Sequence, residues 1–146
     1  MNSVLNRLQS ISRSFQSLPL WVRIWIAGWL VPVNAASVFF LDTPIGFWTA
    51  ISAGLVGISN TWLAFRLRGL SRALAFPHLA VWVPLCLVIA ARLSGPDAET
   101  MGRAEFLYGA IVLATNTVSI GFDLVDAFRW IAGDRSVPGP GASEQA

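Results

Sequence analysis

The sequence contains no lysine, and it has one cysteine and one histidine among its 146 residues. The lone Cys86 can form no disulfide within the chain, and the paired-cysteine spacings of redox and zinc motifs are missing. A zinc site needs several nitrogen, sulfur or carboxylate ligands, and a bis-histidine haem site needs two imidazoles, which His78 alone cannot supply. These absences predict a protein that holds no metal and no cofactor.

Charged residues are scarce as well. They make up 12% of the chain, whereas soluble domains carry about 25%. Hydrophobic residues make up 55%, and a formal net charge of +2 is too small to favour nucleic acid as a partner. The expected solvent is therefore a lipid bilayer. Because every basic residue is arginine, whose codons are GC-rich, we expect a bacterial source.

Signatures of catalysis are also missing. The chain has no glycine-rich phosphate loop, no H-E-x-x-H zinc motif and no G-x-S-x-G nucleophile elbow. A set such as Ser71, His78 and Asp123 would arise by chance in any chain of this length. The sequence therefore favours a protein that is not an enzyme.

Four apolar stretches are present, at residues 20–41, 45–65, 73–94 and 106–131. Each is close to the roughly 20 residues that an α-helix needs to cross a bilayer. The predicted fold class is all-α: a multi-pass membrane protein whose residues 20–131 form a bundle of four transmembrane helices.

Arginine placement predicts the orientation of this bundle. With the N-terminus inside, the short cytoplasmic segments hold most of the arginines, and only Arg92 and Arg103 lie outside. The positive-inside rule therefore places both termini in the cytoplasm, in a bacterial inner membrane. The cytoplasmic arginines are Arg7, Arg13, Arg23, Arg66, Arg68, Arg72, Arg129 and Arg135.

The two terminal segments differ from the spans. In residues 1–19, apolar side chains recur every three or four positions, which is typical of an amphipathic helix. We expect this helix to lie in the cytoplasmic membrane interface, with a coiled-coil or partner-packing helix as the alternative. Residues 132–146 have no apolar content to fold around and are predicted to be disordered.

The second span carries a stripe of small residues at spacings of four, three and four: Ala50, Gly54, Gly57 and Thr61. Small residues let a neighbouring helix approach closely in a membrane. The stripe therefore predicts a helix-packing face, inside the monomer in the first interpretation and between copies in the second.

Depth in the bilayer brings three polar residues to one level. At about 1.5 Å per residue, Asn60, His78 and Asp123 all fall in the cytoplasmic half of their spans. Ionisable groups at such depth usually face the bundle interior, where they find one another. One hypothesis is a proton-accepting His78; the other is an imidazole that only satisfies carbonyls freed by Pro77 and Pro84.

The fourth span extends this polar level in both directions. Asn116, Ser119, Asp123 and Asp126 share one face of the helix, as a lined cavity or a buried helix would require. Asn116 could bond to Asn34 across helices, and Asp126 could pair with Arg129 at the interface. The candidate site thus comprises His78, Asp123, Asn60, Asn116 and Asp126.

Two functions fit these patterns. The first is a small, non-enzymatic inner-membrane protein that assembles with itself or with another membrane protein as an accessory subunit. The second is an oligomeric channel or a proton-linked carrier of small solutes, which would use the polar cluster in the inner leaflet.

Overall fold

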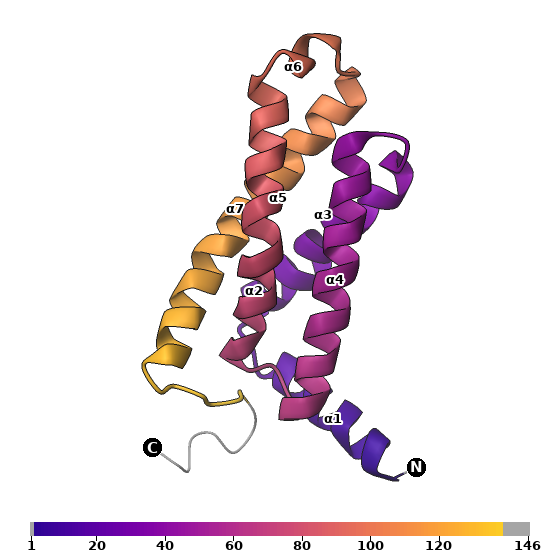
Figure 1. The fold of residues 1–146 in the computed structure, drawn as a ribbon. Coiled ribbons are helices and arrows are strands. Elements are labelled where there is room, and N and C mark those ends of the chain that lie inside the picture. The colour runs from indigo at the N-terminus through magenta and orange to yellow at the C-terminus, as the bar shows by residue number, and fades with distance from the viewer. Residues whose placement is uncertain (1, 139–146) are drawn as a thin grey trace.

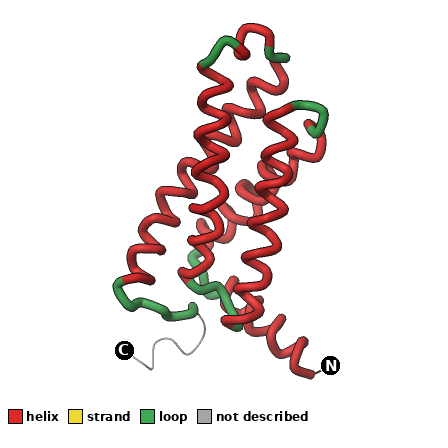
Figure 2. Tube along the Cα trace, viewed as in Figure 1, coloured by secondary structure: helices red, strands yellow, loops and turns green. Residues whose placement is uncertain are grey.

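The chain is described from residue 2 to residue 138 by a computed structural model, and within that range it is helical without any strand. The long helices are α4 (Pro44–Leu67), α5 (Ala75–Ser94) and α7 (Arg103–Ile131). They lie side by side with the segment 20–40, and short loops join them at the two ends of the bundle (Figures 1 and 2). The predicted all-α class is confirmed.

Three helical segments are long and apolar enough to cross a membrane: Leu20–Phe40, Arg72–Ser94 and Arg103–Ile131. They cover the first, third and fourth apolar stretches of the sequence. The helix α4 covers the second stretch but is not among the three.

The first of these segments is irregular. It consists of α2 (Leu20–Ile24), the π-helical turn η1 (Trp25–Leu30), α3 (Val31–Ala35) and the 3-10 turn η2 (Ala36–Phe40). Pro32 lacks the N–H that would bond to the carbonyl four residues earlier, and the turn before it is wide, with the Val31 N–H bonded to the Ile26 carbonyl. A proline therefore explains why this segment is not one regular helix.

A tight link joins the first segment to α4. Thr43 caps α4 by accepting a hydrogen bond from the Gly46 N–H at 3.1 Å, and Pro44 occupies the first turn. Any side chain on Gly46 would collide with the Phe40 carbonyl. Glycine at position 46 therefore allows the close approach of α4 to the end of η2 at this link.

The core lies along the contact between α5 and α7, which is the most extensive in the molecule. Ile89 and Trp82 of α5 pack there with Val112 of α7, and Ile45 adds the start of α4. Large apolar side chains elsewhere remain exposed, among them Ile58 at 74% and Phe128 at 74%. This inverted surface is what a protein surrounded by lipid presents.

Helix α1 (Asn2–Gln16) lies at the same end of the bundle as the end of α7 (Figure 1). Its attachment is polar: Arg7 donates to the Phe65 carbonyl at 3.0 Å, and the buried Ser14 hydroxyl accepts the Leu70 N–H at 3.0 Å. The apolar Val4 and Leu8 stay exposed.

Residues 132–138 run back along this end of the bundle. The Arg135 guanidinium lies 4.6 Å from the centre of the Trp130 ring, and Val137 reaches Gly69. From residue 134 to residue 138 the segment has no helix or strand, and the disorder that the sequence predicted for the tail stays a prediction. Residues 139–146 of the predicted tail, and Met1, lie outside the described residues.

Candidate functional site

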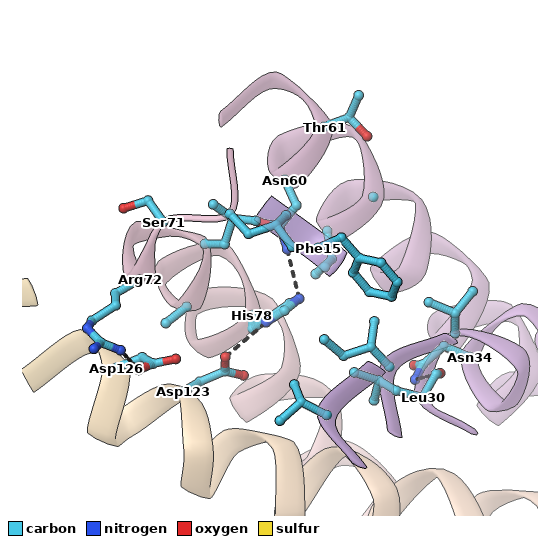
Figure 3. A pocket seen from close by; sticks show the side chains of 18 of the residues that line it. Phe15, Leu30, Asn34, Asn60, Thr61, Ser71, Arg72, His78, Asp123 and Asp126 are labelled. Atoms are coloured by element: carbon cyan, nitrogen blue, oxygen red, sulfur yellow. Dashed lines mark hydrogen bonds and ion pairs between the residues drawn. The ribbon is translucent and has the colours of Figure 1, made fainter. Parts of the chain in front are cut away.

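Three helices bring Asn60, His78 and Asp123 into one hydrogen-bonded array. Asn60 of α4 lies 2.8 Å from the His78 Nε2, and the His78 Nδ1 lies 3.1 Å from an Asp123 carboxylate oxygen. Figure 3 shows the imidazole of α5 between the amide of α4 and the carboxylate of α7. The residues that the sequence placed at one depth are thus in direct contact.

The array suits either protonation state of the imidazole. A neutral ring with its proton on Nδ1 donates to Asp123 and accepts from the Asn60 amide N–H. A protonated ring donates from both nitrogens, and the Asn60 carbonyl oxygen then accepts once the amide turns over. Asn60, His78 and Asp123 can therefore gain or lose one proton without losing either contact.

Trp82 holds the ring from one side, and sequence reasoning missed it. It follows His78 by one turn of α5, and the two rings stack at 4.2 Å between centres with only 7° between their planes. Trp82 is itself buried in the core. The four-residue spacing from the only histidine was the signal that could have identified it.

A cavity of about 590 Å³ lies beside the array. Its wall is mostly apolar, and its only charged or titratable members are Arg72, His78, Asp123 and Asp126. His78 and Asp123 keep 18% and 14% of their side-chain surface exposed. The apolar side chains that line it include Phe15, Leu18, Val22, Ile26, Leu30 and Val56 (Figure 3).

Polar atoms without partners gather around this cavity. Among the described residues, six buried side-chain nitrogen or oxygen atoms have no hydrogen bond. Two are the Asn60 Oδ1 and the Asp123 Oδ2 of the array, and a third is the Trp82 Nε1. A fourth, the Ser119 hydroxyl, lies one turn from Asp123 on α7. Three of the six atoms, on Asn60, Trp82 and Asp123, therefore belong to side chains that line the cavity.

Arg72 closes the end of the site next to α1. Its guanidinium contacts Asp126 and Asp134, both at 2.9 Å. The pKa of Asp134 is lowered by hydrogen bonds from the Ser136 hydroxyl and from Arg72. Asp126 forms an ion pair as the sequence suggested, but the predicted partner Arg129 was wrong. The 3-10 turn η3 (Arg72–Leu74) brings Arg72 to α7 instead.

Asn116 belongs to a separate polar layer nearer the other end of the bundle. Its amide exchanges two hydrogen bonds with that of Asn34, at 2.9 and 3.2 Å, and both residues are buried. Next to them, the Trp29 N–H donates to the Thr115 hydroxyl at 3.0 Å. The expected amide bond across helices is therefore present. Asn116 has no hydrogen bond to the His78 array, although Asn34 lines the same cavity.

The small-residue stripe of α4 is not covered by another helix. Gly54 and Gly57 are exposed, and a Cβ built on either one meets nothing within 4 Å. A packing face inside the monomer, which the spacing favoured, is therefore not formed at these glycines. Gly57 and Thr61 line the cavity instead, and a contact between copies stays a prediction.

Other chemistry finds little support in the described residues. Ser71 caps η3 by accepting the Ala73 N–H at 3.3 Å, and Figure 3 shows its hydroxyl oxygen directed away from His78. Across residues 2–138 no three His, Cys, Asp or Glu side chains converge as a metal site would require. No known protein family, curated protein or solved structure matches the chain.

Proposed function

We propose that the chain is a small, non-enzymatic protein of a bacterial inner membrane, in which His78 and Asp123 exchange protons with the cavity as part of solute transport. The observation that carries the proposal is a hydrogen-bonded His–Asp pair, partly exposed, on the wall of a cavity among membrane-crossing helices. Ionisable groups inside a membrane protein are costly and commonly mark a proton or ion path.

In this proposal α4 also crosses the membrane, which brings the number of spans to four. Its 24 residues extend roughly 36 Å at 1.5 Å per residue, more than the roughly 30 Å of a hydrocarbon core. Exposed Ile58 and Trp62, at 74% and 64%, suit a lipid-facing helix. Asn60 and Gly57 lower its average hydropathy, and both line the cavity.

The proposed orientation places α1 and the end of α7 at the cytoplasmic face. Eight arginines lie in segments at or near the end of the bundle that holds α1, while Arg92 and Arg103 belong to the opposite end. This bias supports cytoplasmic termini. The exposed Val4 and Leu8 on α1 support its place in the membrane interface, with the arginines directed to lipid phosphates.

Proton uptake changes the charge of the pair by one unit. With a neutral imidazole and an ionised carboxylate, His78 and Asp123 together carry −1, and one added proton brings them to zero. Asn60 and Trp82 hold the imidazole in either state, since one bonds to Nε2 and the other stacks on the ring. A solute in the cavity then binds more or less tightly according to the charge of the pair.

The test is proton flux in liposomes that contain the purified full chain and an imposed pH gradient. We expect the wild-type protein to dissipate the gradient, and Asp123→Asn and His78→Gln to abolish flux while the proteins remain folded. Asp97→Asn is a matched control, because Asp97 is an exposed carboxylate in the opposite loop. Wild-type protein that moves no protons, even when small solutes are supplied, would contradict the proposal.

We further propose that the protein works as an oligomer or as an accessory subunit of a membrane complex. The support is the uncovered face of α4 at Gly54, which leaves room for a second helix. Replacing Gly54 by leucine should block close approach and reduce the mass measured after gentle extraction. An unchanged mass would contradict assembly through this face.

A further inference from the structure

We infer that the solute is a lipophilic amine in its protonated form, which reaches the cavity sideways from the bilayer leaflet next to α1. This inference rests on the proposed proton-linked function and names its substrate class. Three observations carry it: the charge of the cavity wall, its unpartnered acceptor atoms and the position of its exposed lining residues.

The charge of the wall favours a cation. Arg72 is the only arginine that lines the cavity, and it is already shared between Asp126 and Asp134. Asp123 therefore has no cationic partner unless His78 is protonated. With a neutral imidazole, the wall carries one unbalanced negative charge in surroundings that are mostly apolar. A bound cation neutralises this charge.

The unpartnered atoms favour a cation that donates hydrogen bonds. Both the Asn60 Oδ1 and the Asp123 Oδ2 are acceptors without a donor, and both lie behind the cavity surface, so an ammonium group bonds to them when the two side chains turn toward the cavity. An ammonium group brings several N–H donors, whereas a quaternary ammonium brings charge without any. The aromatic surfaces of Phe15 and Trp82 line the same space, which suits an organic cation with an apolar or aromatic body.

The exposed lining residues locate the opening. Val31 and Ala35 on α3 and Gly57 and Thr61 on α4 line the cavity and are exposed. Val31 and Ala35 lie inside the apolar segment 20–40, and Gly57 and Thr61 lie inside α4, all away from the ends of these spans, so the opening faces the side of the bundle. In a membrane that side is lipid. A ligand that partitions into the bilayer can therefore reach His78 and Asp123 without crossing an aqueous mouth.

Exchange at the site keeps its charge constant. When the ammonium enters, one positive charge is added and one proton leaves the His78–Asp123 pair toward the α1 end. Release of the amine reverses the exchange, because the pair takes up a proton again. The site therefore alternates between a protonated state and an amine-bound state, which couples amine movement to proton movement in the opposite direction.

The binding test uses phenylbutylammonium with two analogues of similar size: its trimethylated quaternary form and the neutral phenylbutanol. Equilibrium dialysis of the detergent-extracted full chain should give the order ammonium first, then the quaternary cation, then the alcohol. Asp123→Asn should weaken ammonium binding ~30-fold or more, the loss expected when one partner of a buried charge pair is removed. Equal binding of the three compounds would overturn the inference.

A second readout uses the fact that His78 is the only histidine. With ¹⁵N-labelled histidine and a purification tag that lacks histidine, each ring signal belongs to His78. Phenylbutylammonium should move these signals toward those of the neutral ring, whereas phenylbutanol should not. If the chemical shifts of the His78 ring do not change when phenylbutylammonium is added, the inference is wrong.

Two glycines supply a matched pair of variants. Gly57 lines the cavity and Gly121 of α7 does not, although both are exposed and uncrowded. Gly57→Leu should reduce ammonium binding and Gly121→Leu should leave it unchanged; equal effects would count against this cavity. If the protein carries protons but binds no ammonium, the inferred substrate class is wrong and the proposed proton-linked function stands. If the protein binds ammonium but carries no protons, the proposed function is wrong and the inferred ligand class stands.

Discussion

The bundle contains two polar layers that cross between helices, and they are built in opposite ways. In the Asn34–Asn116 layer the two amides exchange two hydrogen bonds, the Asn34 amide also donates to the Leu30 carbonyl, and Asn116 has no exposed surface. Asn34 borders the same cavity as the Asn60–His78–Asp123 layer, but in the latter layer two acceptor atoms have no partner. A layer whose hydrogen-bonding groups are all paired holds helices together, whereas a layer with unpaired acceptors can accept a proton or a ligand.

The largest effect on stability is expected from breaking the satisfied layer. Asn116→Leu leaves the Asn34 amide buried without its partner, which should lower the free energy of unfolding by about 1–3 kcal/mol. Thermal unfolding in a mild detergent measures this as a lower Tm. The double variant with Asn34→Leu should lose less than the sum of the two single changes. An unchanged Tm for Asn116→Leu would remove the distinction between the layers.

A smaller loss should follow from the bond next to that layer. Trp29→Phe keeps an aromatic ring but removes the N–H that donates to the Thr115 hydroxyl. We expect a loss of about 1 kcal/mol in the free energy of unfolding, the usual net value of one hydrogen bond. The control is Trp21→Phe, because Trp21 is exposed and contacts the Phe122 ring. A larger loss for the control would contradict the assignment.

Near-neutral stability is expected when the open layer is made apolar. Replacing both His78 and Asp123 by leucine removes a buried charged pair together with an unpartnered oxygen, and such replacements are often neutral or stabilising. The free energy of unfolding should stay within about 1 kcal/mol of the wild type, while proton flux and ammonium binding are lost. Destabilisation as large as that of Asn116→Leu would mean that this layer is structural too.

The sequence predicted how deep these residues lie, but not which way they face. Counting from the arginines at the helix ends placed Asn60, His78 and Asp123 at one level, because the rise per residue of a helix is fixed. The rotation of each helix depends on what packs against it. The same spacing rule therefore identified Gly54 and Gly57 as one face but could not show that no helix of this chain covers that face.

The sequence also could not predict which residues pair across long distances in the chain. Asp126 has Arg129 one turn away, so a local pair was the simplest expectation. Its actual partner, Arg72, lies 54 residues earlier and is positioned by the turn η3. Likewise, the irregular first segment was predicted as one helix, because nothing but Pro32 signals the wide turn before it. Tertiary packing decides the partner of Asp126, whereas Pro32 is a local signal for the irregular segment that the sequence analysis did not use.

The smallest effect concerns the segment 132–138, which Arg72 ties to the open layer through Asp134. Hydrogen bonds from Ser136 and Arg72 lower the pKa of Asp134. A lowered folded-state pKa contributes stability that is present at neutral pH and lost as the pH falls through that pKa, below the ordinary value of about 3.9. Amide hydrogen exchange of Arg135 to Val137, corrected for the intrinsic rate, should therefore be constant near neutrality and accelerate in acid.

Asp134→Asn should show the faster exchange at every pH, without a change in Tm, because Asp134 lies at the surface and Arg72 keeps its contact with Asp126. Exchange around Asn116 should not respond to either change, since that layer holds no titratable group. The contrast between a closed and an open polar layer would then extend to their dynamics. Equal protection of residues 135–137 in both proteins would show that Arg72 does not hold this segment.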